Sequence, residues 1–424
     1  MFINAKVNRD KLEHGDDPDT VEWVKRQNSL TLEQFSKGLD FERLVQRCRD
    51  LLKEEQSRPP IPTRAEDGNL YRVFGEGLGT LERRAVDQDE WMQLLDLNSL
   101  SGVENIRWML NSYHIDPISD QALISLSKEG SDGCKIMEYD LSKKQFVEDG
   151  FSLPIGENKA VWIDADRVLF KSNHKHSIHG QKTVSLSKEI EIWTRHKGSE
   201  TIFSTIKQEE EVDFHYHRSG NLVISSRSLH HEFSNYLVPD LLTPKSNIPL
   251  HLPPQAQIRG FIDNRLIIIT GPPWYNFPMF SVLAICLKTG QVTQVFTPLK
   301  GYISQVSVLS DKILILERRL DNFDLWEICY NNGSFKRNRL NYPLSGSIEI
   351  VSSTEQSDYL VFYFNYLVPK TAYLHRNTCP PKLLHRDPDM FDPRKFEHIS
   401  YCSTGFDGKQ IPYTVIKPKD LVFD

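Results

Sequence analysis

The sequence predicts an all-β protein, a seven-bladed β-propeller preceded by a short α-helical segment. Three observations lead to this prediction. From residue 68 onward, short apolar runs alternate with Gly, Asn, Asp and Pro, a pattern typical of many short strands joined by turns. A polar turn residue followed by an apolar strand then recurs seven times, and a strand–turn–strand hairpin follows most of these units at a similar distance.

The first 56 residues are predicted to form the helical segment. Asp16, Asp17 and Pro18 offer a helix cap and a first-turn proline. Apolar residues at i, i+3, i+4 and i+7 spacing indicate a second, amphipathic helix of about three turns with one apolar stripe. These residues are Phe41, Leu44, Val45, Cys48, Leu51 and Leu52. Three prolines between residues 57 and 62 fix φ and remove amide donors, so the segment 1–56 ends before them.

The repeated units predict a propeller over residues 64–392. The first strand residues of the seven units are Leu70, Ala122, Val168, Leu222, Leu266, Ile313 and Leu360. Successive positions in this series lie 44 to 54 residues apart, which leaves room for the four strands of a propeller blade. Hairpins are predicted at residues 139–146, 193–202, 285–295 and 328–335, where polar turns that include Asn-Gly and Thr-Gly pairs suit positive φ.

Two or three β-sandwich domains are the competing all-β interpretation, but they do not predict so even a period. Radial closure of the blades also explains how so many strands avoid a long exposed edge. The fourth unit is the least regular, because prolines interrupt it between residues 239 and 254. Its outer strands are the least defined part of the prediction.

The composition excludes several classes of protein. The chain of 424 residues has a formal net charge of −6 with acids and bases mixed along it, which argues against binding to nucleic acid or an anionic membrane. The N-terminus lacks the apolar core of a secretory signal, and the apolar stretch 360–368 is too short to span a membrane. Six scattered cysteines without a C-x-x-C pair indicate reduced thiols, so we expect a cytoplasmic protein without a cofactor.

Histidines form two groups that are candidate metal ligands. His174, His176 and His179 lie close in sequence, and His215 and His217 would share one face of a strand. No third or fourth ligand can be identified for either group. We therefore expect a solvent-exposed loop and a strand edge, and we assign no metal site.

Two further groups were considered as peptide contacts. An aromatic loop at residues 274–277 follows the sequence Gly-Pro-Pro and either lines a peptide-binding surface or packs on a neighbouring blade. Arg318 and Arg319, with Asp321 and Asp324, either bind a peptide terminus or pair with one another as solvated ions. The packing and pairing interpretations are favoured, so no substrate-binding residue is assigned.

Several segments resemble the prolyl oligopeptidase family of serine peptidases, in particular a bacterial branch. Trp23, Val24, Gln27, Asn28 and Thr31 fit a W-V-x-x-Q-N-x-x-T helix of that family. Residues 125–154 are similar to a segment of that bacterial branch, and residues 365–373 are similar to the last blade. Residues 391–397 and 407–413 are similar to the exit from the propeller, which ends in a D-G-x-x-I-P strand. Residues 14–17 depart from the aromatic-Trp-Leu-Glu run that commonly precedes the first helix. The resemblance covers residues from about 17 to 424.

The resemblance implies a propeller that covers the active site of an oligopeptide-cleaving serine peptidase and restricts access by size. It also implies that residues 395–424 are the first strands of an α/β-hydrolase domain, and that the partners are an oligopeptide and the rest of that domain. The family's nucleophile lies in a G-x-S-x-G elbow, and no such sequence occurs in this chain. No catalytic residue is therefore assigned, and we expect the chain alone to be inactive.

Three interpretations of the chain stay open at this point. It is part of a longer active peptidase, or it works beside a separately encoded hydrolase chain, or it is a stand-alone propeller that binds proteins or peptides. The DNA that follows the last codon distinguishes them.

Overall fold

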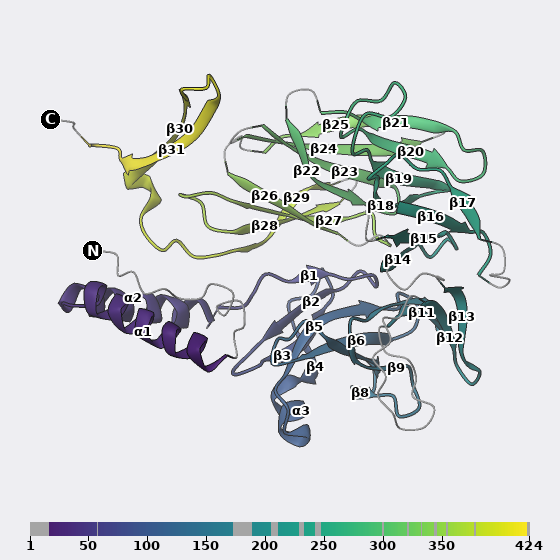
Figure 1. Cartoon of the computed structure of the whole chain (residues 1–424), viewed down its shortest axis with the longest axis horizontal. Helices are drawn as coiled ribbons and strands as arrows, with labels where there is room; N and C mark the ends of the chain where they lie inside the picture. Colours follow the sequence, from purple (N-terminus) through teal and green to yellow (C-terminus); the bar gives the residue numbers. More distant parts are fainter. Residues whose placement is uncertain are drawn as a thin grey trace. The chain divides into compact units, whose positions relative to one another are not determined.

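The chain divides into two compact units, residues 1–60 and 61–424. The computed structural model describes residues 17–56, 58–172, 189–204, 211–228, 233–241, 247–298, 301–319, 322–331, 333–342, 346–352, 355–376 and 379–421. Figure 1 shows the sheets of the second unit following one another in chain order, from purple through teal to green.

The first unit is a pair of helices, α1 (Pro18–Phe35) and α2 (Leu39–Gln56). The predicted cap is confirmed, because the Asp17 carboxylate accepts a hydrogen bond from the amide of Asp19 at 2.9 Å and Pro18 begins the helix. Large apolar side chains stay exposed on both helices, among them Phe35 at 68% and Leu44 at 62%. No helix in the described part of the chain is long and apolar enough to cross a membrane.

The second unit contains seven antiparallel sheets, each built from consecutive strands. Blade 1 is β1 (Thr63–Arg64), β2 (Leu70–Phe74), β3 (Thr80–Arg84) and β4 (Met92–Asp96). Blade 2 is β5 (Trp108–Ile115), β6 (Gln121–Lys128), β7 (Cys134–Asp140) and β8 (Gln145–Phe146), with β9 (Ser152–Gly156) also pairing with β7. Blade 3 is β10 (Lys159–Asp164), β11 (Arg167–Lys171), β12 (Glu189–Thr194) and β13 (Gly198–Ser204).

The remaining four blades complete the ring. Blade 4 is β14 (Glu211–Tyr216), β15 (Leu222–Arg227), β16 (Phe233–Val238) and β17 (Ile248–Leu250). Blade 5 is β18 (Gln257–Ile262), β19 (Arg265–Ile269), β20 (Val282–Cys286) and β21 (Val292–Phe296). Blade 6 is β22 (Tyr302–Val308), β23 (Lys312–Arg319), β24 (Asn322–Asn331) and β25 (Ser334–Leu340). Blade 7 is β26 (Ser347–Ser352), β27 (Tyr359–Phe364), β28 (Thr371–Arg376) and β29 (Cys379–Arg386).

The repeat read from the sequence is the second strand of every blade. The seven predicted strand residues all lie in second strands and are fully buried: Leu70, Ala122, Val168, Leu222, Leu266, Ile313 and Leu360. Buried apolar clusters join adjacent blades, as where Ile267 of blade 5 and Ile313 of blade 6 belong to one cluster. Second strands are apolar on both faces because each face packs on a neighbouring blade, and this two-sided burial produced the sequence signal.

The first strand of each blade is the innermost one. First strands of adjacent blades contact each other around the ring, for example β18 with β22 and β22 with β26, and β1 contacts β26 where the ring closes. No strand is exchanged between the first and last blades, so side chains make this closure. Arg64 lies 2.8 Å from Asp358, and the Gln356 amide donates to the Glu66 carbonyl at 2.7 Å.

One element was not expected from the sequence. A helix, α3 (Leu97–Glu104), connects blades 1 and 2, capped by Asp96 at its start and by Asn105 in the left-handed region at its end. After the blades, β30 (Phe396–Thr404) and β31 (Gln410–Pro418) form an antiparallel hairpin. A short 3₁₀ turn, η2 (Pro393–Lys395), precedes the hairpin.

Candidate functional site

The topology gives the propeller two different faces. Strands one and three of a blade run in one direction, and strands two and four run back. The links between blades and the loops between second and third strands therefore lie at one end, which we call the connection face. The turns after first and third strands lie at the other end, the turn face. Since β1 begins and β29 ends at the connection face, the chain enters and leaves the propeller there.

The turn face holds charged side chains in ion pairs between blades. Arg83 of blade 1 lies 2.6 Å from Asp120 of blade 2. Arg218 of blade 4 lies 2.7 Å from Asp116 of blade 2, whose side chain is fully buried. Because blade 3 stands between blades 2 and 4, this second pair reaches past the inner strand of blade 3. Side chains therefore constrict the propeller axis at the turn face.

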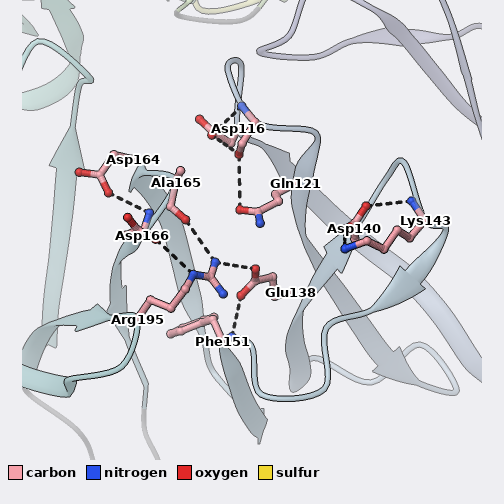
Figure 2. Close-up of polar contacts among 11 residues, drawn as sticks. Asp116, Gln121, Glu138, Asp140, Lys143, Phe151, Asp164, Ala165, Asp166 and Arg195 are labelled. Atoms are coloured by element: carbon pink, nitrogen blue, oxygen red, sulfur yellow. Dashed lines mark hydrogen bonds and ion pairs between the residues drawn. The ribbon is translucent and has the colours of Figure 1, made fainter.

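The most buried of these pairs joins blades 2 and 3 through Glu138 on β7. Its carboxylate is fully buried and accepts hydrogen bonds from the guanidinium of Arg195 at 2.8 Å and from the Phe151 amide at 2.9 Å. Arg195 also donates to Asp166 at 3.3 Å, so its guanidinium lies between the two carboxylates in Figure 2. A Cβ at Gly150 would lie 2.7 Å from the Glu138 carboxylate, so only glycine leaves room there. The buried charge is thus enclosed by protein donors.

The connection face instead exposes large apolar side chains. The loop between β19 and β20 carries Tyr275 at 83% exposure, followed by Met279 and Phe280 at 47% and 45%. Tyr366, in the loop between β27 and β28, is 62% exposed. Apolar exceptions on the turn face are Ile118 at 82% and, at the starts of β4 and β17, Met92 at 46% and Ile248 at 48%. Apolar side chains gathered at one end of a domain are typical of a surface that another domain or partner covers.

The aromatic loop at residues 274–277 has both a packed part and an exposed part. Trp274 and Phe277 exchange backbone hydrogen bonds and pack against the apolar cluster of blades 4 and 5. Tyr275 has a φ of 49° and is mostly exposed, although its ring centroid lies 4.8 Å from that of Trp274. The loop is therefore anchored by two of its aromatic side chains and presents the third.

Solvent reaches the inner strands from the connection face. Gln257 at the start of β18 and Tyr302 at the start of β22 are exposed, whereas Ile262 and Val308 at the opposite ends of these strands are buried. First strands have neighbours on both sides, so their exposed side chains face the axis. In blades 5 and 6, the inner strands are therefore exposed at their connection-face ends and buried at their turn-face ends.

The other candidate residues lie apart from one another. His174, His176 and His179 lie outside the described residues, as does Asp321. His215 lies on β14, while His217 follows it and contacts Ser219 at 2.8 Å. Among the described residues no group of three His, Cys, Asp or Glu side chains could hold a metal.

Arg319 of blade 6 pairs with Asp324, as expected from the sequence, but the carboxylates it contacts are buried and not solvated, and Arg318 lies over the ring of Phe323. Arg319 lies 3.1 Å from Glu317 and 3.0 Å from Asp324. Sequence reasoning did not identify the pairs of Glu138 and Asp116. Their partners lie 57 and 102 residues away, and no local pattern marks such a distance.

Comparison with known proteins places this geometry in a family. The model of the prolyl oligopeptidase N-terminal beta-propeller domain matches residues 10–378. An uncharacterized peptidase of Sinorhizobium fredii is 22% identical over 96% of this chain and 60% of its own length. One from Rickettsia prowazekii is 23% identical over 97% of this chain and 62% of its own length. The chain thus spans about three fifths of the curated relatives it matches.

Solved structures agree on the fold. A post-proline cleaving enzyme from Rickettsia typhi superposes with a TM-score of 0.81 at 21% identity, covering 98% of this chain and 65% of that one. Prolyl oligopeptidase B from Galerina marginata gives 0.75 at 15% identity, covering 98% and 62%. The seven blades, the single face of entry and exit and the family match agree: the chain belongs to the prolyl oligopeptidase N-terminal β-propeller family.

Proposed function

We propose that this chain is the substrate-access propeller of a prolyl oligopeptidase-like serine endopeptidase acting on oligopeptides, and that its connection face docks an α/β-hydrolase domain. One observation carries the proposal. Both chain connections, the exposed apolar loops and the exposed starts of the inner strands β18 and β22 all occur at the same face. A hydrolase domain on this face would cover the apolar side chains and receive peptides through the axis or past the rim.

Exposed apolar side chains in α2 and in the β30–β31 hairpin support the proposal that a partner domain covers them. Phe41, Leu44 and Leu52 of α2 are between 38% and 62% exposed, although burying such side chains stabilises a fold by roughly 1.5–3 kcal/mol each. In the β30–β31 hairpin, Tyr401 and Tyr413 stack with ring centroids 5.4 Å apart, yet both stay exposed. Both outer edges of this hairpin have strand hydrogen-bonding groups that a larger sheet would pair.

Selection by size follows from the way the blades pack. Adjacent blades share buried apolar clusters and are joined at the turn face by pairs such as Asp116 with Arg218. Widening the axis would separate these surfaces and leave Asp116 buried without its cation, which is costly. A flexible oligopeptide fits such an opening, whereas a folded protein does not.

The chemistry is assigned to the partner domain, because the chain has no G-x-S-x-G sequence. We expect the purified chain to leave proline-containing peptides intact and to resist labelling by a serine-directed phosphonate. Stoichiometric labelling of one serine would contradict this assignment. The six cysteines are all free, which supports a reducing, cytoplasmic location as part of the proposal.

A chimera tests the access role. Residues 1–424 are joined to the part of the Rickettsia typhi enzyme that lies beyond the matched region, and that part is also made alone. The substrates are a short proline-containing peptide and a folded protein that carries the same sequence in an exposed loop. We expect the chimera to cleave the peptide and spare the protein. Equal cleavage of both substrates by a folded chimera would contradict the role in access.

A further inference from the structure

The inner strands of blades 3, 4 and 5 bring an excess of positive charge together. Lys159 begins β10, Lys171 ends β11 and Arg259 lies on β18. Asp213 and His215 lie between them on β14. The starts of first strands and the ends of second strands both belong to the connection face. Lys159 and Lys171 therefore lie at the connection face, Asp213 and Arg259 lie near the middle of their strands, and His215 lies toward the other end of β14.

A single carboxylate is shared by the two lysines. The ammonium groups of Lys159 and Lys171 lie 2.9 Å and 3.3 Å from the same oxygen of Asp213. Both lysines also donate to backbone carbonyls of β14, at 2.6 Å and 3.0 Å. Burial would raise the pKa of Asp213, but the two ammonium groups outweigh it and the pKa is lowered. One carboxylate against two ammonium groups leaves one positive charge uncompensated.

Arg259 adds a second uncompensated charge. Its guanidinium contacts the side-chain oxygen of Gln257 and forms no ion pair within the described residues. It lies at a bulge of β18, where the register shifts between Ile258 and Gly260, and a bulge redirects its side chain. The side chain is exposed, yet burial lowers its pKa.

The pKa of His215 is affected by the same positive charges. Burial lowers its pKa to about 4, and the charge of Lys159 lowers it further, with Lys171 and Arg259 adding to the effect and Asp213 opposing it. The imidazole is therefore neutral at neutral pH and can donate or accept a hydrogen bond. The cluster offers two unmatched cations beside a neutral hydrogen-bonding group.

We propose that Lys159, Lys171 and Arg259 form a carboxylate-binding site in the axial space, and that the ligand is the C-terminus or an acidic side chain of an oligopeptide. The proposal rests on the access role, which makes an oligopeptide the expected occupant. Arginine suits this ligand because its planar fork matches a carboxylate with two parallel hydrogen bonds. A carboxylate would also supply the negative charge that the blades themselves do not.

Binding of three peptides to the isolated chain, measured by calorimetry at low salt, tests the site. One is a blocked pentapeptide with a central glutamate, the second has glutamine in its place, and the third is the glutamine peptide with a free C-terminal carboxylate. Hydrogen bonds to charged groups contribute about 1.5–3 kcal/mol, so we expect each carboxylate peptide to bind at least about tenfold more tightly than the neutral one. The two carboxylate peptides show which source the site prefers.

Two variants should move this preference in opposite directions. Arg259→Gln removes a cation whose only side-chain contact is Gln257, and it should reduce the preference to less than about threefold. Asp213→Asn removes the competing carboxylate and should strengthen binding of both carboxylate peptides. Lys336→Gln, on the outer strand β25, changes the net charge equally with Arg259→Gln and should leave the preference intact. A general loss of folding cannot produce one gain and one loss.

Several results would overturn the site. Equal affinity for the glutamate and glutamine peptides would do so, as would a preference that survives Arg259→Gln or no binding at millimolar concentration. Tighter binding of inorganic phosphate than of either carboxylate peptide would replace the peptide assignment with a general anion site. None of these outcomes affects the chimera, whose failure would overturn the access role separately.

Discussion

The two faces of this propeller differ in which side chains they bury and which they expose. At the turn face, charges such as Glu138 and Asp116 are fully buried but receive partners from other blades. At the connection face, Tyr275 and Tyr366 are mostly exposed, with no part of the propeller covering them. The turn face is thus complete within this chain, whereas the connection face has the properties of a surface that needs a partner. Removing a partner of a buried charge at the first face should lower stability, whereas removing an exposed apolar side chain at the second should not.

The largest effect is expected from Arg195→Ala at the turn face. It leaves the fully buried Glu138 without its cation, and breaking such a pair costs about 3–5 kcal/mol of unfolding free energy. Arg394→Ala removes an exposed pair with Asp392 and should leave stability unchanged. Urea unfolding of both variants checks this. A similar small change in both would show that Glu138 does not depend on Arg195.

A smaller effect is expected from acid, through a histidine between blades 6 and 7. His375 stacks on Tyr359 at 4.8 Å, and burial lowers its pKa to about 4. The unfolded chain binds this proton near pH 6.5 while the native chain does not, so stability is full above that pH and falls as pH drops toward 4. The fall is on the order of 3 kcal/mol for this group.

Unfolding measured between pH 7 and pH 4 for the wild type and for His375→Phe isolates this contribution. The variant should have a shallower dependence on pH, whatever its stability at pH 7. An unchanged slope would show that His375 titrates alike in both states.

The sequence predicted what is local and repeated. All seven second strands were predicted because each contains a short apolar run that follows a turn residue. The α3 helix was not, although Asp96 and Asn105 are ordinary cap residues, because its eight residues make only about two turns, too few to show a helical apolar period. The cluster of Lys159, Asp213 and Arg259 could not be predicted, because three separate blades contribute it and a bulge places one member. Ring closure brings such residues together without any local sequence pattern.

The smallest effects on stability are expected from substitutions of two residues in the aromatic loop. Tyr275→Asn removes an exposed ring at a positive φ that asparagine tolerates, so stability should change by less than about 0.5 kcal/mol. Phe277→Asn removes a ring packed against the cluster of blades 4 and 5 and should cost on the order of 1 kcal/mol or more. Thermal unfolding of the two variants distinguishes them. A large loss with Tyr275→Asn would mean that the connection face is internally packed.

Hydrogen exchange tests most directly whether this chain is built for a partner domain. In the isolated monomeric chain, we predict that amides of α1, α2 and the β30–β31 hairpin exchange orders of magnitude faster than those of β11, β19 and β27. In the chimera with the rest of the Rickettsia typhi enzyme, the helices and the hairpin should become protected while the blades stay unchanged. Protection of both ends equal to that of the blades in the isolated chain would contradict the account, because the ends would then already be docked without a hydrolase domain.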